Sequence, residues 1–217
     1  MRLKLFLCVT VLLAALCAPV RVSAGDRTAF SLRVGAAATI PTAWHGDGGF
    51  TIDMYRPGTS MSLGGHVRVA LAGGWYVEPG VVASYSRFRY DELYTAEGGF
   101  ESDGNPAVDR LIFAVPVVAG YTFDLGGFGL SVFTGPELSL GAVGRFNPRK
   151  PELWEGVNRN IYSKEMNRVG ASWKVGAMAG LGMFEIGLEA AIGMTDMLQG
   201  ALSCRESRVG ATIGYCF

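Results

Sequence analysis

Hydrophobic and polar residues alternate along most of the chain after residue 30. Apolar side chains recur at every second position, which is the period of a β-strand, and no stretch shows a convincing helical period. The pattern predicts eight strands, at residues 30–40, 61–71, 75–88, 111–123, 128–142, 169–182, 184–195 and 208–217. Each spans about 10–15 residues, longer than the strands of soluble sheets and enough to cross a bilayer at a tilt.

The two faces of each predicted strand differ in kind. In residues 184–195, one face carries Phe184, Ile186 and Leu188, and the other carries Glu185 and Glu189 among small residues. The segments 30–40 and 208–217 repeat this division. In a soluble barrel the apolar face would point inward and the polar face would form the exterior. An exterior so rich in glycine and so poor in lysine is not typical of a soluble barrel. We therefore expect the apolar face to point outward.

The connections between the strands alternate in length. Three are short, at residues 72–74, at 124–127 and near Met183, and the others are mostly longer, at 41–60, 89–110, 143–168 and 196–207. Short turns at one rim and long loops at the other are typical of outer-membrane barrels. The sequence thus predicts an all-β fold, an eight-stranded antiparallel up-and-down transmembrane β-barrel over residues 25–217.

Glycine and charge indicate what fills this barrel. The chain has 31 glycines, and of the 16 in the predicted strands all but Gly65 lie on the polar face. An eight-stranded barrel has an interior just wide enough for side chains, so small residues there make room for long ones. Buried charges need partners, and we expect a lumen charge network of Arg33, His66, Arg68, Glu78, Glu137, Lys174, Glu185, Glu189 and Arg208. The alternative is an ion pathway.

Aromatic residues gather on the outward face at the short-turn end. The predicted aromatic girdle consists of Phe30, Trp75, Phe123, Phe128, Phe184, Tyr215 and Phe217. Such rings favour the boundary between membrane and water.

The first 24 residues resemble a secretory signal peptide. A positive start precedes an apolar stretch from Leu5 to Val20, and Val22-Ser23-Ala24 offers a cleavage site after Ala24. Cleavage leaves 16 basic and 19 acidic residues, a net charge of about −3, which does not indicate nucleic-acid binding. Cys204 and Cys216 remain, about 40 Å apart along one strand, too far for a disulfide or a shared metal.

Candidate chemistry is sparse, and we expect no cofactor, no metal site and no catalytic residue. His45 falls in the first long loop and His66 on the inner face, where a lumen histidine combined with a serine and a glutamate is the enzymatic alternative. The second long loop is acidic, and we expect it to be solvated, with cation binding as the alternative. The third carries Arg149, Lys150, Arg159 and Lys164, which could touch lipid phosphates, a partner or the second loop.

Several segments resemble one protein family. These are Trp75-Tyr-Val-Glu-Pro-Gly-Val-Val-Ala-Ser-Tyr-Ser, Leu111-Ile-Phe-Ala-Val-Pro-Val-Val-Ala-Gly-Tyr-Thr-Phe, Val132-Phe-Thr-Gly-Pro-Glu and Val209-Gly-Ala-Thr-Ile-Gly-Tyr-Cys-Phe. They look like strands of the PorT-like branch of small outer-membrane β-barrel proteins, over most of residues 28–217. The resemblance implies an eight-stranded barrel and prolines within strands, as at Pro79, Pro116 and Pro136. Its namesake is linked to type IX protein secretion, and no functional residue carries over.

These observations lead to one functional expectation and two alternatives. We expect a non-enzymatic integral protein of the bacterial outer membrane, with a plugged lumen and exposed loops, in envelope integrity, adhesion or support of a secretion apparatus. Its expected partners are outer-membrane lipids and lipopolysaccharide, the barrel-assembly machinery that reads the terminal Tyr215-Cys216-Phe217, and secretion-system proteins. The first alternative is a narrow pore for small solutes, and the weaker one is a membrane-embedded lipid hydrolase.

Overall fold

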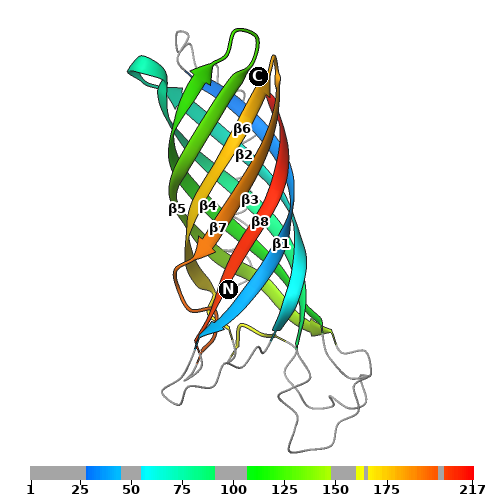
Figure 1. Ribbon diagram of the computed structural model, residues 1–217. Helices are drawn as coiled ribbons and strands as arrows, with labels where there is room; N and C mark the ends of the chain where they lie inside the picture. Colours follow the sequence, from blue (N-terminus) through cyan, green and yellow to red (C-terminus); the bar gives the residue numbers. More distant parts are fainter. Residues whose placement is uncertain (1–27, 45–54, 91–106, 148–159, 164–165, 200–202) are drawn as a thin grey trace, which may run out of the picture.

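A single closed barrel makes up the described part of the chain in the computed structural model, which covers residues 28–44, 55–90, 107–147, 160–163, 166–199 and 203–217. The strands are β1 (Thr28–Trp44), β2 (Tyr55–Ala70), β3 (Trp75–Tyr90), β4 (Ala107–Asp124), β5 (Gly129–Asn147), β6 (Val169–Leu181), β7 (Phe184–Gly193) and β8 (Ser203–Cys216). Each strand pairs antiparallel with its neighbours in sequence, and β8 closes on β1. Figure 1 shows the strands tilted around a tall, narrow cylinder. The predicted eight-stranded antiparallel up-and-down barrel is confirmed.

The short connections lie together at one end, as expected (Figure 1). A 3₁₀ turn, η1 (Ala72–Gly74), joins β2 to β3, and tight turns join β4 to β5 and β6 to β7. Each of these connections contains a glycine at positive φ, among them Gly73 at 70° and Gly126 at 72°, a conformation that side chains with a Cβ rarely adopt. We call this rim the short-turn end and the opposite rim the long-loop end.

Large apolar side chains cover the outside of the barrel. Val34, Met61 and Leu188 are 59%, 72% and 69% exposed, while the charged residues between such positions are buried. The outward-facing Trp173 still donates its indole N–H to Thr134 Oγ1, at 2.7 Å. The period-two pattern therefore has the predicted polarity, apolar outside and polar inside.

Several strands extend further toward the long-loop end than the sequence pattern predicted. β2 begins at Tyr55, β4 at Ala107 and β8 at Ser203, and β5 runs to Asn147. Each added segment contains at least one charged residue, and strand pairing continues through it, with a register shift between Arg56 and Thr59 in β2. A strand that leaves an apolar environment can keep its ladder while its outer residues become polar.

The three prolines expected within strands, Pro79, Pro116 and Pro136, are accommodated without a change of register. Pro79 pairs with Val117 and Pro116 with Glu137, and the pairing offset on either side of each is the same. The register shifts lie away from these three prolines. One is between Arg56 and Thr59, a span that contains Pro57 of β2, and the other is between Leu111 and Ile112. Pro79, Pro116 and Pro136 therefore need no bulge, and each removes only its own N–H from the ladder.

In the described part of the chain, no helix has the length and apolar character that a membrane-crossing helix requires. The predicted signal peptide over residues 1–24 lies outside the described residues, as do His45, most of the acidic loop and the basic residues of the third loop.

Candidate functional site

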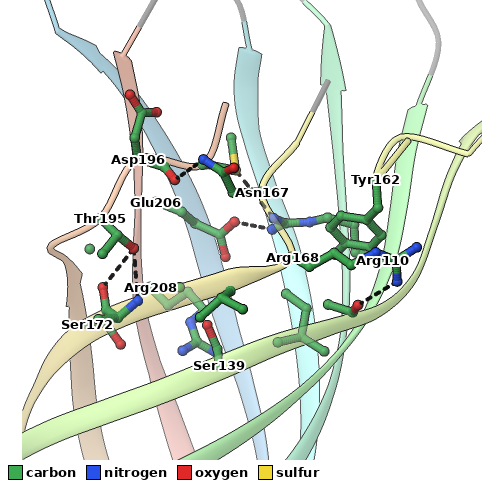
Figure 2. A pocket seen from close by; sticks show the side chains of 17 residues that line it. Arg110, Ser139, Tyr162, Asn167, Arg168, Ser172, Thr195, Asp196, Glu206 and Arg208 are labelled. Carbon is green, nitrogen blue, oxygen red and sulfur yellow. Dashed lines mark hydrogen bonds and ion pairs between the residues drawn. The ribbon is translucent and has the colours of Figure 1, made fainter. Parts of the chain in front are cut away.

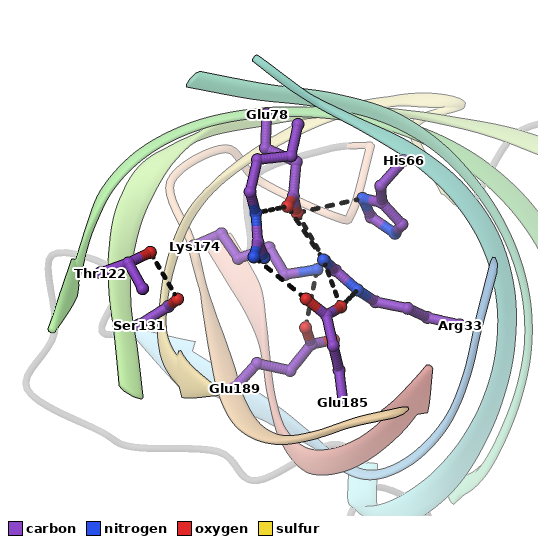
Figure 3. Close-up of polar contacts among 9 residues, drawn as sticks. Arg33, His66, Glu78, Thr122, Ser131, Lys174, Glu185 and Glu189 are labelled. Carbon is purple, nitrogen blue, oxygen red and sulfur yellow. Dashed lines mark hydrogen bonds and ion pairs between the residues drawn. The ribbon is translucent and has the colours of Figure 1, made fainter. Parts of the chain in front are cut away.

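The lumen is filled by the charged side chains that the sequence pattern placed there. Arg33, His66, Glu78, Glu137, Lys174 and Glu185 are buried, and the side chains of Arg68, Glu189 and Arg208 are 22%, 23% and 18% exposed. Figure 3 looks into the barrel and shows side chains of this set, among them Arg33, Glu78 and Glu185, reaching inward from different strands to meet near the axis. All nine therefore lie inside the barrel, and they divide into separate clusters.

The central cluster is a ring of two arginines and two glutamates. Arg33 of β1 contacts Glu78 of β3 through two nitrogens, at 2.5 and 2.9 Å, and Glu185 of β7 at 2.9 Å. Arg68 of β2 contacts the same two carboxylates, at 2.8 and 3.0 Å. Each carboxylate thus faces two guanidinium groups, which satisfies its lone pairs in a site without bulk water.

Tyr76 and His66 flank this ring. The guanidinium carbon of Arg68 lies 4.5 Å from the centroid of the Tyr76 ring, a cation–π contact. His66 Nδ1 is 3.7 Å from Glu78 Oε1, within ion-pair range but beyond hydrogen-bonding distance. Tyr76 was not among the predicted site residues, although its place on the inner face next to Glu78 in the period-two pattern could have identified it.

Two further pairs complete the predicted set. Lys174 of β6 contacts Glu189 of β7, at 2.9 Å. Arg208 of β8 contacts Glu137 of β5, whose carboxylate also accepts a hydrogen bond from Ser172, at 3.2 Å. The structure therefore distributes the nine residues among the ring, the flanking His66 and two separate pairs.

A further ion pair lies nearer the long-loop end of the lumen and was missed from the sequence. Arg110 of β4 contacts Glu206 of β8 inside the barrel, and its guanidinium also lies 4.7 Å from the centroid of the Phe88 ring. Both charged residues had been assigned to loops, because the predicted strands began one and two residues later. Continuing the alternation through Arg110 and Glu206 would have placed both on the inner face.

An apolar plug closes the lumen at the long-loop end, and the sequence analysis did not foresee it. The plug consists of Phe88, Val108, Phe146, Ile161, Tyr162, Met166, Met197, Leu198 and Cys204, all buried. Ile161, Tyr162 and Met166 come from the β5–β6 connection, and Met197 and Leu198 come from the β7–β8 connection. Burial in the plug raises the pKa of the Tyr162 phenol, which keeps its hydroxyl protonated.

Backbone hydrogen bonds hold the two connections to each other and to the wall. Ile161 donates its N–H to the Gly144 carbonyl of β5, at 3.3 Å, and Asn167 donates its N–H to the Met197 carbonyl, at 2.9 Å. The Asn167 side chain donates to the Leu198 carbonyl, also at 2.9 Å. The plug is therefore tied to the barrel by directional bonds as well as by apolar packing.

Glycines on the inner face provide the space for the large interior rings. A Cβ at Gly120 would collide with the Tyr76 ring, one at Gly141 with the Tyr162 ring, and one at Gly176 with the Phe133 ring. Glycines are therefore concentrated on the inward-facing side of the strands because this narrow cylinder has no room there for a Cβ beside the large rings.

A cavity of about 70 Å³ remains between the plug and the charge clusters. Figure 2 shows its wall, to which Arg110, Arg168 and Arg208 contribute together with Ser139, Thr195 and Glu206. This is space for a few water molecules among polar groups.

The surroundings of His66 do not form a hydrolytic triad. Ser31 lies opposite His66 in the β1–β2 pair, but no hydrogen bond joins their side chains in the described structure. Glu78, the nearest carboxylate, is occupied by two arginines. A triad needs a hydrogen-bonded serine, histidine and carboxylate, so the described contacts of His66 are those of a packed lumen residue.

Other candidate residues are placed as follows. Cys204 and Cys216 form no disulfide and lie at opposite ends of β8. Asp109, assigned to the acidic loop, instead belongs to β4 and accepts a hydrogen bond from Tyr85 Oη, at 2.7 Å. Among the described residues, no three His, Cys, Asp or Glu side chains form a group suited to a metal ion.

The predicted aromatic girdle surrounds the short-turn end, and most of its rings touch. Centroid distances are 5.6 Å for Phe30 and Phe217, 5.0 Å for Tyr215 and Phe217, and 5.5 Å for Phe184 and Tyr215. Tyr121, which was not predicted, links Trp75 and Phe123, at 5.3 and 4.8 Å. Phe128 is 42% exposed at the same end.

Comparisons with known proteins give similarity at the level of shape alone. No family profile and no curated protein sequence matches the chain, so the resemblance to the PorT-like branch stays a prediction. The fold is similar to Neisserial surface protein A (TM-score 0.46, 10% identity, covering 86% of this chain and 97% of that one). It is also similar to Ail, the attachment invasion locus protein of Yersinia pestis (TM-score 0.39, 17% identity, 88% and 99%), and to LpxR from Salmonella typhimurium (TM-score 0.33, 9% identity, 85% and 99%).

Proposed function

We propose that this chain is a non-enzymatic integral protein of the bacterial outer membrane, whose filled barrel anchors the long loops at the cell surface. In this role it contributes to envelope integrity, to adhesion or to the support of a secretion apparatus. The observation that carries the proposal is the lumen, where ion-paired side chains and an apolar plug occupy the space that a channel would need.

The exterior supports the membrane placement. Large apolar side chains such as Leu32, Val34 and Ile213 face outward without partners and are 44%, 59% and 61% exposed, which is costly in water and favourable in lipid. The aromatic girdle marks one edge of this band. By analogy with other outer-membrane barrels, the short-turn end faces the periplasm and the long-loop end faces outside.

The lumen supports an anchoring role over a transport role. The Arg33, Arg68, Glu78 and Glu185 ring connects four strands across the axis. Removing one member of a buried ion pair costs about 3–5 kcal/mol, so thermal motion rarely opens such a ring. The plug adds a second barrier at the other end.

Conductance in planar bilayers tests this proposal. We expect the purified, refolded protein to give no steady channels under conditions in which an open porin of 16 strands conducts. Steady unit conductance from the wild-type protein would contradict the proposal that the lumen is filled. Density-gradient fractionation tests the location, because recovery with the inner membrane or the soluble fraction would contradict it.

A narrow pore for small solutes is the second candidate, and the 70 Å³ cavity is the observation that favours it. In that case Ile161→Gly combined with Met166→Gly, which thins the plug, would increase an existing wild-type conductance. If the barrel is filled, the wild-type protein shows no conductance. Lipid hydrolysis that is lost in His66→Ala would instead favour an enzyme.

A further inference from the structure

Exposed arginines of β2, β3 and β5 gather on one stretch of the outer wall near the long-loop end. Arg56 of β2, Arg87 and Arg89 of β3, and Arg145 of β5 all face outward and are exposed. We call these four residues the arginine wall. They are separate from the lumen clusters, because the neighbouring Phe88 and Phe146 are buried inside the barrel.

The strand register places the arginines in two rows around the barrel. In the row nearest the rim, Arg56 lies directly opposite Arg89. In the next row, Arg87 lies opposite Asp109, and Asp109 lies opposite Arg145. Directly opposed residues have Cβ atoms about 5 Å apart, and the two rows are about 7 Å apart along the strands. The four arginines therefore lie on one continuous stretch of the outer wall, from β2 to β5.

Arg87 of this surface has an acidic neighbour and is still exposed. Asp109 is its one described carboxylate, with Arg87 Nε at 3.5 Å and the Tyr85 hydroxyl at 2.7 Å. The Arg87 side chain is still 49% exposed. A phosphate beside Arg87 and Arg89 would offer acceptor oxygens to two exposed guanidinium groups.

The apolar belt begins one row below the arginine wall. Met61, Tyr85 and Val143 face outward there and are 72%, 46% and 47% exposed. A ligand that fills this surface must therefore place acyl chains against the belt and negative groups about 7 Å higher. Arginine suits phosphate, because its planar fork donates two parallel hydrogen bonds.

We propose that the arginine wall binds the phosphate groups of the outer-leaflet glycolipid, the lipid A part of lipopolysaccharide, with its acyl chains lying on the belt below. The choice of a glycolipid rests on the proposed outer-membrane placement with the long loops outside. Bound lipid A would fix the height of the barrel in the membrane and its lipid neighbours along β2–β5.

Binding is tested with the full mature protein refolded in detergent micelles. Lipid A with both phosphates, dephosphorylated lipid A and phosphatidylglycerol are titrated separately, and bound lipid is counted by native mass spectrometry. We expect one tightly held molecule of lipid A and weak retention of the other two. Each arginine near a headgroup contributes about fivefold, so Arg87→Gln, Arg89→Gln and Arg145→Gln together should weaken binding on the order of 100-fold.

Arg205→Gln is the matched control. Arg205 is also an exposed arginine at the long-loop end, but it lies on β8, opposite Thr42 of β1 and away from the arginine wall. This variant should bind lipid A as wild type does. Heat-modifiable migration on gels reports whether each variant folds, and if the triple variant does not, Arg89→Gln alone should fold and bind about fivefold less.

Three results would overturn the proposal. They are unchanged binding in the folded variants, equal binding of dephosphorylated lipid A, and equal binding of phosphatidylglycerol, which would indicate a general anionic-lipid surface. Because this assay uses purified protein, its outcome is independent of the fractionation that tests the cellular location. A failure of the lipid A proposal can therefore be distinguished from a failure of the proposed outer-membrane location.

Discussion

Arg33 of β1 and Glu78 of β3 form a two-point ion pair inside the barrel, at 2.5 and 2.9 Å, although β2 lies between their strands. Glu78 also contacts Arg68, at 2.8 Å, so one carboxylate balances two guanidinium groups contributed by two strands. This relationship is possible because side chains on the inner face of a narrow barrel converge toward one axis (Figure 3).

Removing the Glu78 carboxylate should destabilise the barrel strongly. In Glu78→Gln, Arg33 and Arg68 stay buried beside a neutral amide, and we expect a loss of about 3–5 kcal/mol in the free energy of unfolding. Urea unfolding in lipid vesicles, followed by tryptophan fluorescence, measures it. Glu189→Gln is the control, since its side chain is 23% exposed and contacts Lys174, so a smaller loss is expected. Equal losses would contradict a special role for the ring.

A methyl group at Gly120 should be poorly tolerated. Its Cβ would collide with the Tyr76 ring and with the Val132 carbonyl, and the backbone atom cannot move aside as a flexible side chain can. We expect Gly120→Ala to cost about 1–3 kcal/mol in unfolding free energy. Gly127→Ala should change it by less than about 0.5 kcal/mol, because no atom lies within 4 Å of the added Cβ. Similar stabilities of the two variants would argue against steric matching in the lumen.

Thinning the apolar plug should loosen the connections that form it. Ile161 and Met166 are fully buried, and each truncation to alanine removes about 2 kcal/mol or more of packing. In Ile161→Ala with Met166→Ala, the amides of Met166 and Asn167 should exchange hydrogen more than about tenfold faster. Hydrogen–deuterium exchange measures this directly. Leu188→Ala on the lipid-facing side is the control, and unchanged exchange in the plug variant would show that packing there does not hold the loops.

Deleting Phe217 should impair barrel assembly. Its N–H donates to the Phe30 carbonyl of β1, at 2.9 Å, and its ring contacts Phe30 and Tyr215, so it joins the closing strands of the barrel. We expect less folded, heat-modifiable protein in the membrane, with Phe217→Tyr near the wild-type level. Normal amounts of folded protein after the deletion would count against this prediction.

The alternation of residues predicted the strands and their two faces well, because each inward or outward position depends only on the local period of two. Arg33, Glu78, Glu137 and Lys174 were placed inside on that basis alone. Strand ends were predicted less well, as Arg110 and Glu206 show. Their charges resembled those of a loop, and only the closed barrel shows that both point inward and pair.

The sequence by itself determined the number of strands, the outward apolar band, the aromatic end and most of the charges in the lumen. The tertiary structure decided which of those charges meet, because the pairing of each strand with the next sets which inner positions share a height. It also decided that Ile161 and Met166 enter the barrel as a plug and that Arg56, Arg87, Arg89 and Arg145 gather on one wall. Such contacts join residues far apart in the chain, and their geometry follows from closure of the barrel rather than from any local pattern.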